Sequence, residues 1–277
     1  MRTMFLVGDG IAHSLSPAMW NHFFTTTARD IEYGLRDVDG AGLADVLTEI
    51  RSGPVFAANV TMPHKAWAAS ASDRRSHAVE ATGVANLLVP QSGALESHNT
   101  DVAGARSILE SRAPFESVLV LGAGGTSVSL LEALAGLATS VAIANRTPER
   151  ATSLAGRYSR RFASITARPW AERDDLVASA DLVVSTVPAV DASPVDVTRF
   201  RSHALVYDAA YRPRPTAFQN ALAHRGVPVA DGLAHLAAQA IGMLALLGFG
   251  PDDAPVLVEG LERATERPVT AWGAPLV

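Results

Sequence analysis

Cysteine is absent from this chain of 277 residues, and lysine occurs only once. The lack of cysteine excludes disulfides, thiolate catalysis and Cys-ligated metals, and it is compatible with a cytoplasmic protein. The single lysine is Lys65, while the rest of the 23 Lys and Arg residues are arginines. Arginine cannot release its proton, whereas lysine can do so in suitable surroundings. Lys65 therefore indicates either a site of proton transfer or a chance survivor of arginine-rich codon usage.

Basic stripes and long apolar runs are also missing. The net charge is −5, which argues against a nucleic-acid partner and requires any anionic ligand to be held by a few local groups. The most apolar stretch, residues 233–250, is interrupted by His235 and Gln239. Their spacing of four residues predicts a buried helix with one polar face and no membrane span. The apolar run near the N-terminus is too short for a signal peptide.

Short apolar strands alternate with helical stretches along most of the chain. Strands are predicted at residues 3–8 and 55–61, with helices opening near Pro17, behind Ser16 as N-cap, and near Pro63. From residue 102 onward, strand and helix alternate again through residue 231. This pattern predicts an α/β fold with a doubly wound parallel sheet. The predicted domains are residues 1–101 plus 232–277, with the C-terminal tail on the first domain, and residues 102–231.

A glycine-rich turn follows the predicted strand at residues 117–121. Gly122, Gly124 and Gly125 stand directly before a helix, where backbone amides can bind a pyrophosphate. Ser127 occupies the position of the third glycine in the usual pattern. The order of strand, turn and helix predicts dinucleotide binding. The alternative is a tight packing turn that binds no ligand.

The end of the next strand bears on the choice of dinucleotide. NAD enzymes commonly place an acid there, whereas this chain has Asn145, Arg146 and Thr147, then Arg150. An arginine can bind the 2′-phosphate of NADP through a charge-assisted bond of about 1.5–3 kcal/mol, which favours NADP over NAD by about 10- to 150-fold. The alternative is that both arginines belong to a solvated helix start.

A nicotinamide enzyme that reduces a ketone needs a proton donor, and Lys65 is the candidate. Asp101 is its predicted carboxylate partner, at the seam of the two domains, where ligand clefts usually form. Asp101 can alternatively be a helix cap. His64 points away from Lys65, because neighbours on a helix are about 100° apart, so we predict a structural or exposed histidine. The histidines have no metal-site spacing, and we predict no metal.

Ordered motifs extend over the chain from about residue 6 to 250. They read IAHSLSP, NVTMPHK, NTD, GAGG, NRT and YDAAYRP, followed by a glutamine in the late helix. In this order they resemble the shikimate dehydrogenase family of the shikimate pathway of aromatic amino acid biosynthesis. The resemblance implies reversible reduction of 3-dehydroshikimate to shikimate with NADPH, and Lys65 and Asp101 as the catalytic pair. It also implies a substrate domain and a Rossmann-type NADP domain with a cleft between them, in a monomer or homodimer.

The resemblance also implies ligand contacts. Ser14, Ser16 and the Tyr211 hydroxyl correspond to the groups that hold the substrate carboxylate. The residues that correspond to contacts of the ring hydroxyls are Asn59, Thr61, Asn86 and Gln239; each amide can alternatively be a structural group of the core. The implied cofactor residues are Gly122, Ala123, Gly124, Gly125, Thr126, Ser127, Asn145, Arg146, Thr147, Arg150, Thr186, Val187, Pro188 and Gly232.

The chain departs from the family pattern at four places. The usual NTDG has Val102 in place of its glycine, GNP reads GDG, and AVNT reads VANL. In the loop at residues 185–194, STVPAVDASP replaces NATPLGM with its methionine near the nicotinamide. This change alters the residues that the resemblance places near the nicotinamide, and with them the expected turnover. The alternatives are a paralogue that acts on quinate or aminoshikimate, and a non-catalytic regulatory protein that binds NADP or a cyclohexene acid.

Overall fold

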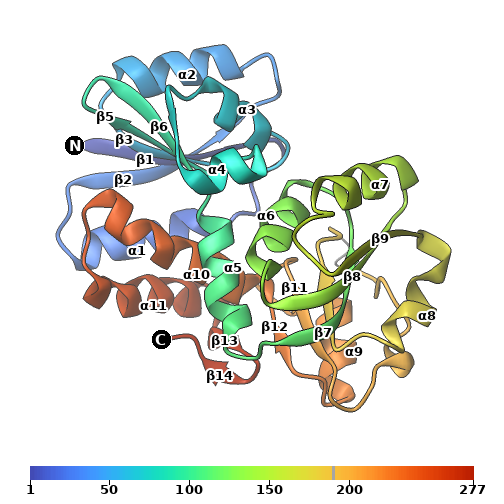
Figure 1. Cartoon of the computed structure of the whole chain (residues 1–277). Helices are drawn as coiled ribbons and strands as arrows, with labels where there is room; N and C mark the ends of the chain where they lie inside the picture. The colour runs from blue at the N-terminus through green and yellow to red at the C-terminus, as the bar shows by residue number, and fades with distance from the viewer. Residues whose placement is uncertain (189–190) are drawn as a thin grey trace. The chain divides into compact units, whose positions relative to one another are not determined.

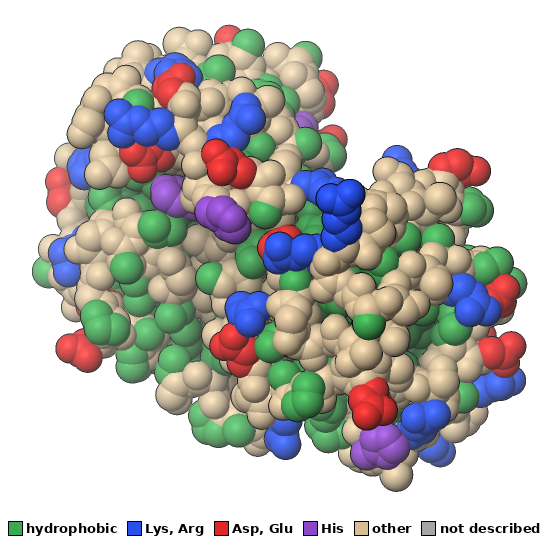
Figure 2. Space-filling view, viewed as in Figure 1, with side chains coloured by type: hydrophobic (Ala, Val, Ile, Leu, Met, Phe, Trp, Pro, Cys, Tyr) green, Lys and Arg blue, Asp and Glu red, His purple; other side chains and the backbone are tan. Residues whose placement is uncertain are grey.

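The computed structural model describes residues 1–188 and 191–277, and these form two compact α/β units (Figure 1). The first comprises Met1–Gly104, Leu236–Arg267 and Val277, and the second comprises Ala105–His235 and Pro268–Leu276. Figure 2 shows acidic and basic side chains interspersed over much of the face drawn there. The predicted α/β class is confirmed by both units.

The first unit is built on a six-stranded mixed sheet with the order β2-β1-β3-β5-β6-β4. The parallel strands β2, β1 and β3 carry the apolar runs that the sequence predicts, and β5 and β6 form the antiparallel hairpin around residues 92–93. The bounds are β1 Arg2–Gly8, β2 Ile31–Asp37, β3 Val55–Val60, β4 Arg74–Arg75, β5 Leu87–Gln91 and β6 Ala94–His98.

Helices cover both faces of this sheet, as Figure 1 shows for α2 on one face and for α1 and α11 on the other. Phe5 and Val7 of β1 pack against Val46 and Ile50 of α2 in one apolar core. On the other face, Gly260 allows α11 to approach the backbone of α1 closely. The helices of this unit are α1 Ser16–Thr26, α2 Leu43–Ser52, α3 Lys65–Ala71, α4 His77–Thr82 and α11 Ala254–Thr265. Two more helices, α5 Thr100–Glu110 and α10 Gly232–Leu244, have residues in both units.

The second unit is an eight-stranded sheet with the order β14-β13-β12-β11-β10-β7-β8-β9, in which β7 to β12 are parallel. Helices α8 and α9 pack on one face through a core around Leu119, Val183 and Phe218. The strands are β7 Phe115–Leu121, β8 Ala138–Asn145, β9 Ser164–Pro169, β10 Leu182–Ser185, β11 Leu205–Asp208, β12 Val229–Ala230, β13 Thr270–Ala271 and β14 Ala274–Pro275. The helices are α6 Gly125–Leu134, α7 Pro148–Arg157, α8 Arg173–Val177 and α9 Ala217–His224.

The C-terminal tail differs from the prediction. Residues 232–277 were predicted to stay with the first domain, but Pro268–Leu276 belongs to the second unit. Ala271 of β13 pairs antiparallel with Ala230 of β12, and the Trp272 N–H donates to the Val229 carbonyl at 3.0 Å. The buried indole of Trp272 also donates to the Ile108 carbonyl at 3.2 Å. The tail thus forms hydrogen bonds with the edge of β12. The predicted domain assignment was wrong for residues 268–276.

Two smaller features complete the fold. Short 3₁₀ helices occupy Trp170–Glu172, Val197–Arg199, Ala245–Leu247 and Pro251–Asp253. Of the described helices, none is both long and apolar enough to cross a membrane. The apolar stretch that begins at residue 233 forms α10, which has 13 residues.

Candidate active site

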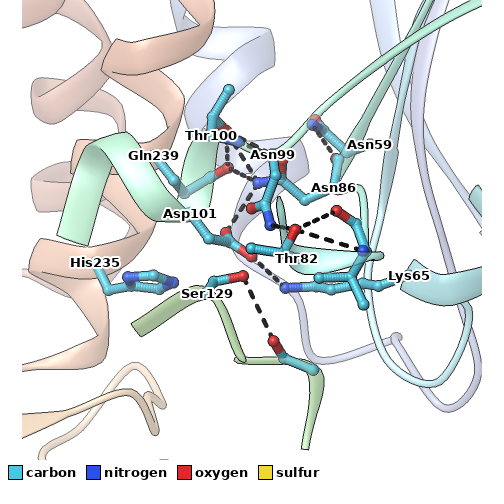
Figure 3. A network of polar contacts seen from close by, with 12 residues as sticks. Asn59, Lys65, Thr82, Asn86, Asn99, Thr100, Asp101, Ser129, His235 and Gln239 are labelled. Atoms are coloured by element: carbon cyan, nitrogen blue, oxygen red, sulfur yellow. Dashed lines mark hydrogen bonds and ion pairs between the residues drawn. The ribbon is translucent and has the colours of Figure 1, made fainter. Parts of the chain in front are cut away.

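Lys65 and Asp101 form an ion pair within the first unit (Figure 3). Lys65 is the first residue of α3, and Asp101 stands in the first turn of α5. The distance from Lys65 Nζ to Asp101 Oδ2 is 2.5 Å, and the side chains are 13% and 4% exposed. Two charges that are mostly withdrawn from water are held together far more strongly than a surface pair. The structure therefore brings the two predicted residues into contact, and their catalytic roles remain a prediction.

Asn86, just before β5, fixes the second carboxylate oxygen. Its Nδ2 donates to Asp101 Oδ1 at 2.8 Å and to Gln239 Oε1 at 3.1 Å. Its Oδ1 accepts the backbone N–H of Thr100 at 2.8 Å, so Asn86 satisfies a free donor at the start of α5. The carboxylate of Asp101 is consequently held from both sides, by an ammonium and by an amide. This orients one oxygen toward Lys65.

Thr100 is a member of this network that the sequence analysis did not single out. Its hydroxyl accepts from Asn86 Nδ2 at 2.9 Å and lies 3.4 Å from Gln239 Oε1. Gln239 reaches the network from α10, and its Nε2 donates to the Leu236 carbonyl at 2.9 Å. The available signal was the NTD motif itself, because Thr100 stands between its asparagine and its aspartate. Figure 3 shows Thr100, Asn86, Gln239 and Asp101 converging from α5, α10 and the segment before β5.

Asn59 and Thr61 lie at the end of β3. The Asn59 amide is buried and has protein partners at both ends: Oδ1 accepts from the Tyr33 hydroxyl at 2.8 Å, and Nδ2 donates to the Asn86 carbonyl at 3.2 Å. Asn59 thus has structural contacts, as Asn86 does, and its contact with the substrate stays a prediction. Thr61 is half-buried, and its methyl group would lie 2.6 Å from a Cβ at Gly8. Gly8 thus permits the loop after β1 to pass close to Thr61.

Ser14 and Ser16 belong to the loop that leads into α1. The Ser14 hydroxyl accepts the Ser16 N–H at 3.2 Å. Ser16 was predicted as the N-cap, but Leu15 holds that position and Ser16 is the first helical residue, so this prediction was wrong by one residue. The loop is held by Asp37, whose Oδ1 accepts the Gly10 N–H at 2.8 Å. Gly10 has φ +70°, which glycine adopts without strain, and the family proline would lack this N–H.

His64 is buried next to Lys65. Its Nε2 lies 2.8 Å from the Val38 carbonyl, so this nitrogen carries the proton and donates. The contact ties the start of α3 to the segment after β2. Of the two alternatives predicted for His64, structural or exposed, the geometry agrees with the structural one.

The glycine turn of the second unit connects β7 to α6. Gly122 has φ +106°, and a Cβ there would lie 2.3 Å from Thr186 Oγ1. Ser127 Oγ lies 2.8 Å from the same Thr186 oxygen and accepts the Gly124 N–H at 3.2 Å. A Cβ at Gly124 would enter open space, so the backbone there is open to a ligand. Gly122, Ser127 and Thr186 thus form a rigid turn at the N-terminus of a ten-residue helix.

Arg146 and Arg150 follow β8 and are exposed. Neither guanidinium has an ion pair or hydrogen bond with another described residue. Asn145 Nδ2 donates to the Thr147 carbonyl at 2.9 Å and shapes the turn between them. Both cations are therefore available to an anion.

The remaining predicted cofactor residues lie at two places in the second unit. Thr186, Val187 and Pro188 follow β10, and residues 189–190 of the altered loop 185–194 lie outside the described residues. Gly232 starts α10, where a Cβ would lie 2.6 Å from the Ala210 carbonyl oxygen. Gly232 therefore permits close packing against the half-buried segment that carries Tyr211. Within residues 1–188 and 191–277, no group of three or more His, Asp or Glu residues is arranged to hold a metal.

Family models match most of both units. Residues 6–88 match the shikimate dehydrogenase substrate binding domain, and residues 104–198 match shikimate/quinate 5-dehydrogenase. The chain belongs to the shikimate dehydrogenase family. This confirms the resemblance seen in the motifs.

Individual relatives agree with this assignment. A shikimate dehydrogenase (NADP(+)) of Mesorhizobium japonicum is 33% identical over 86% of this chain and 87% of its own length. A shikimate dehydrogenase (NADP(+)) of Moorella thermoacetica is 34% identical over 91% of this chain and 89% of its own length. The crystal structure of shikimate 5-dehydrogenase from Thermus thermophilus in complex with NADP(H) and shikimate is 30% identical, with a TM-score of 0.81 over 95% of this chain and 100% of that one.

Proposed function

We propose that this chain is an NADP-dependent shikimate dehydrogenase, which reversibly reduces 3-dehydroshikimate to shikimate. The observation that carries the proposal is the buried contact between the only lysine and Asp101, in a chain whose family acts on this substrate. Relatives over most of its length are shikimate dehydrogenases (NADP(+)), and the Thermus structure holds NADP(H) and shikimate. The enzyme is an oxidoreductase that acts on a ring CH–OH group.

The proton transfer belongs to Lys65. NADPH, when bound, would supply a hydride to the ring carbonyl carbon, so the carbonyl oxygen needs a proton from the protein. Lys65 Nζ donates that proton in reduction and removes it in oxidation. Asp101 Oδ2 accepts a hydrogen bond from Lys65 and sets its direction, while Asn86 keeps the Asp101 carboxylate in place. An arginine at residue 65 would hold the same charge but could not give up a proton.

The substrate is recognised by polar side chains from several motifs. The hydroxyls of Ser14, Ser16 and Tyr211 bind the carboxylate of the substrate. Asn86, Gln239 and Thr61 bind ring hydroxyls. Thr100 joins this set, because its hydroxyl is part of the network around Asp101. Asn59 supports the same residues from within the core.

The cofactor residues fit NADP. The open space at Gly124 and the N-terminus of α6 suit the pyrophosphate. Arg146 and Arg150, which have no ion pair with another described residue, suit the 2′-phosphate. Residues 1–101 with 232–267 accordingly form the substrate domain, and 102–231 form the NADP domain. The remaining assignments are a cytoplasmic enzyme, either monomeric or homodimeric.

Reduction of NADP⁺, followed by NADPH absorbance, tests the proposal with shikimate, quinate and an aminoshikimate. We expect turnover with shikimate and NADP⁺, weak turnover with NAD⁺, and loss of turnover in Lys65→Ala. Turnover confined to quinate or aminoshikimate would keep the mechanism and change the substrate. A folded protein that binds NADPH but turns over none of the three compounds would indicate a non-catalytic regulator. The altered loop at 185–194 would then be the expected cause of the lost activity.

A further inference from the structure

Asp208 is a buried carboxylate that the proposed reaction does not use. It is the last residue of β11, and only 2% of it is exposed. Its Oδ2 accepts from Gln219 Nε2 at 2.8 Å, and its Oδ1 faces the Ala210 N–H at 3.4 Å. The Ser185 hydroxyl donates to it as well. Donors therefore face both oxygens of this carboxylate.

Gln219 extends this contact to the whole loop from residue 209 to 215. Besides Asp208, its Nε2 donates to the Ala210 carbonyl at 2.9 Å, at the start of the loop. Its Oε1 accepts the Thr216 N–H at 3.1 Å, and its own N–H donates to Thr216 Oγ1 at 3.2 Å, at the end of the loop. One buried side chain thus ties both ends of the loop to α9.

The middle of the loop carries Tyr211. Residues 213–215 are exposed, while Tyr211 is half-buried and its carbonyl accepts from Arg212 Nη1 at 3.0 Å. Gly232 packs against the carbonyls of Ala209 and Ala210, where a side chain would not fit. The direction of Tyr211 is therefore set by the anchored segment just before it. The anchor of that segment is Asp208 with Gln219.

We propose that Asp208 is a positioning residue, which acts through Gln219 to hold the 209–215 loop so that the Tyr211 hydroxyl meets the substrate carboxylate. This inference rests on the proposed function. Burial outweighs the opposing effect of the three donors and, with a smaller contribution from the charge of Asp231, raises the pKa of Asp208 to about 6, so the carboxylate is ionised at neutral pH. An asparagine has the same size but turns an N–H toward one of these donors. Asp208→Asn therefore breaks the anchor without leaving a cavity.

The decisive experiment is a double-mutant cycle between Asp208→Asn and Tyr211→Phe. Loss of the Tyr211 hydroxyl contact to a carboxylate raises the KM for shikimate about tenfold. Asp208→Asn should raise it by a similar factor, leave the KM for NADP⁺ within about twofold, and add little once Tyr211 is already Phe. The matched control is Asp196→Asn, an exposed aspartate of the same unit that accepts from the Thr198 N–H at 2.9 Å and should change neither constant.

Additive effects, or an equal rise in the KM for NADP⁺, would overturn the proposal and make Asp208 a purely structural residue. Gln219→Met is the second variant, because it removes both arms of the anchor and leaves the carboxylate in place. It should reproduce the same selective rise in the shikimate KM. A normal shikimate KM in a folded Gln219→Met protein would also overturn the proposal.

A spectroscopic readout separates this inference from the proposed function. The chain has four tyrosines, so 3-fluorotyrosine labelling gives four ¹⁹F signals, and Tyr211→Phe assigns one of them. Asp208→Asn should shift or broaden the Tyr211 signal while those of Tyr33 and Tyr158 stay in place. A protein without shikimate turnover that shows this change would refute the proposed function alone. An unchanged Tyr211 signal would refute the positioning role, whatever the activity.

Discussion

Replacement of Lys65 by arginine and by methionine separates the charge of this residue from its proton. Arginine keeps a cation opposite Asp101 but cannot release a proton, whereas methionine keeps the length of the chain and removes the charge. Both variants should lose about 10²–10⁴ in kcat, because both lack the proton donor. This corresponds to about 3–5 kcal/mol of transition-state stabilisation.

The two variants should differ in stability. The pair is 2.5 Å long with side chains 13% and 4% exposed, and breaking a buried pair costs about 3–5 kcal/mol. Asp101 keeps its bond from Asn86, so we expect Lys65→Met to lose about 3 kcal/mol, near the lower limit. Lys65→Arg should stay within about 1 kcal/mol of the parent, because it retains the charge.

Initial rates at saturating shikimate and NADP⁺ give kcat, and urea unfolding gives the stability. The expected pattern is two inactive enzymes, of which only the methionine variant is destabilised. A Lys65→Arg enzyme that keeps more than about one tenth of kcat would refute proton transfer by Lys65. A Lys65→Met protein as stable as Lys65→Arg would refute the energetic role of the ion pair.

Three further predictions concern other parts of the chain. Arg146→Gln should raise the KM for NADP⁺ about 10- to 150-fold and leave that for NAD⁺ nearly unchanged, with the exposed Arg160→Gln as control. Gly260→Ala places a Cβ 2.9 Å from a backbone oxygen of α1 and should lower the free energy of unfolding by about 1–3 kcal/mol. Gly156→Ala, in α7, places its Cβ in open space and should raise the free energy of unfolding by about 0.5 kcal/mol. Urea unfolding measures both. Burial raises the pKa of Asp208 from 3.8 to about 6, so the folded protein binds this proton more tightly than the unfolded chain does. The protonated form therefore contributes about 3 kcal/mol to the free energy of unfolding below about pH 4, and this contribution is lost as the pH rises to about 6. Asp208→Asn should abolish this loss in urea unfolding at a series of pH values, and an unchanged pH dependence would contradict the assignment.

Sequence reasoning predicted those features that rest on local patterns. The strand and helix order follows from apolar periodicity, and Lys65 is conspicuous because no other lysine occurs. Its contact with Asp101 was a sound expectation, since each residue stands in a recognisable motif. Asp208 stands in the YDAAYRP motif but was not assigned a role, because the letters do not reveal that its carboxylate is buried among donors.

The C-terminal segment at residues 268–276 could not be assigned to the second unit from local patterns. β12 and β13 have two residues each, which is too short for any alternation of apolar and polar residues to be read. Their pairing joins residues 230 and 271, and such a distant contact leaves no trace in local composition. Thr100 was missed for a related reason: a threonine at a helix start is usual, and only its three-dimensional neighbours give it a role.

The single lysine makes this enzyme singular toward amine reagents. Any reagent that is specific for ε-amines has one target in the whole chain, and that target is the ammonium held against Asp101. Reductive methylation with ¹³C-formaldehyde would therefore place one side-chain signal, beside that of the α-amino group, at the proposed proton donor. Coupling to a surface through an ε-amine would likewise have to use Lys65. A coupled enzyme would therefore be inactive, and an enzyme that stays active would be one that did not couple through lysine.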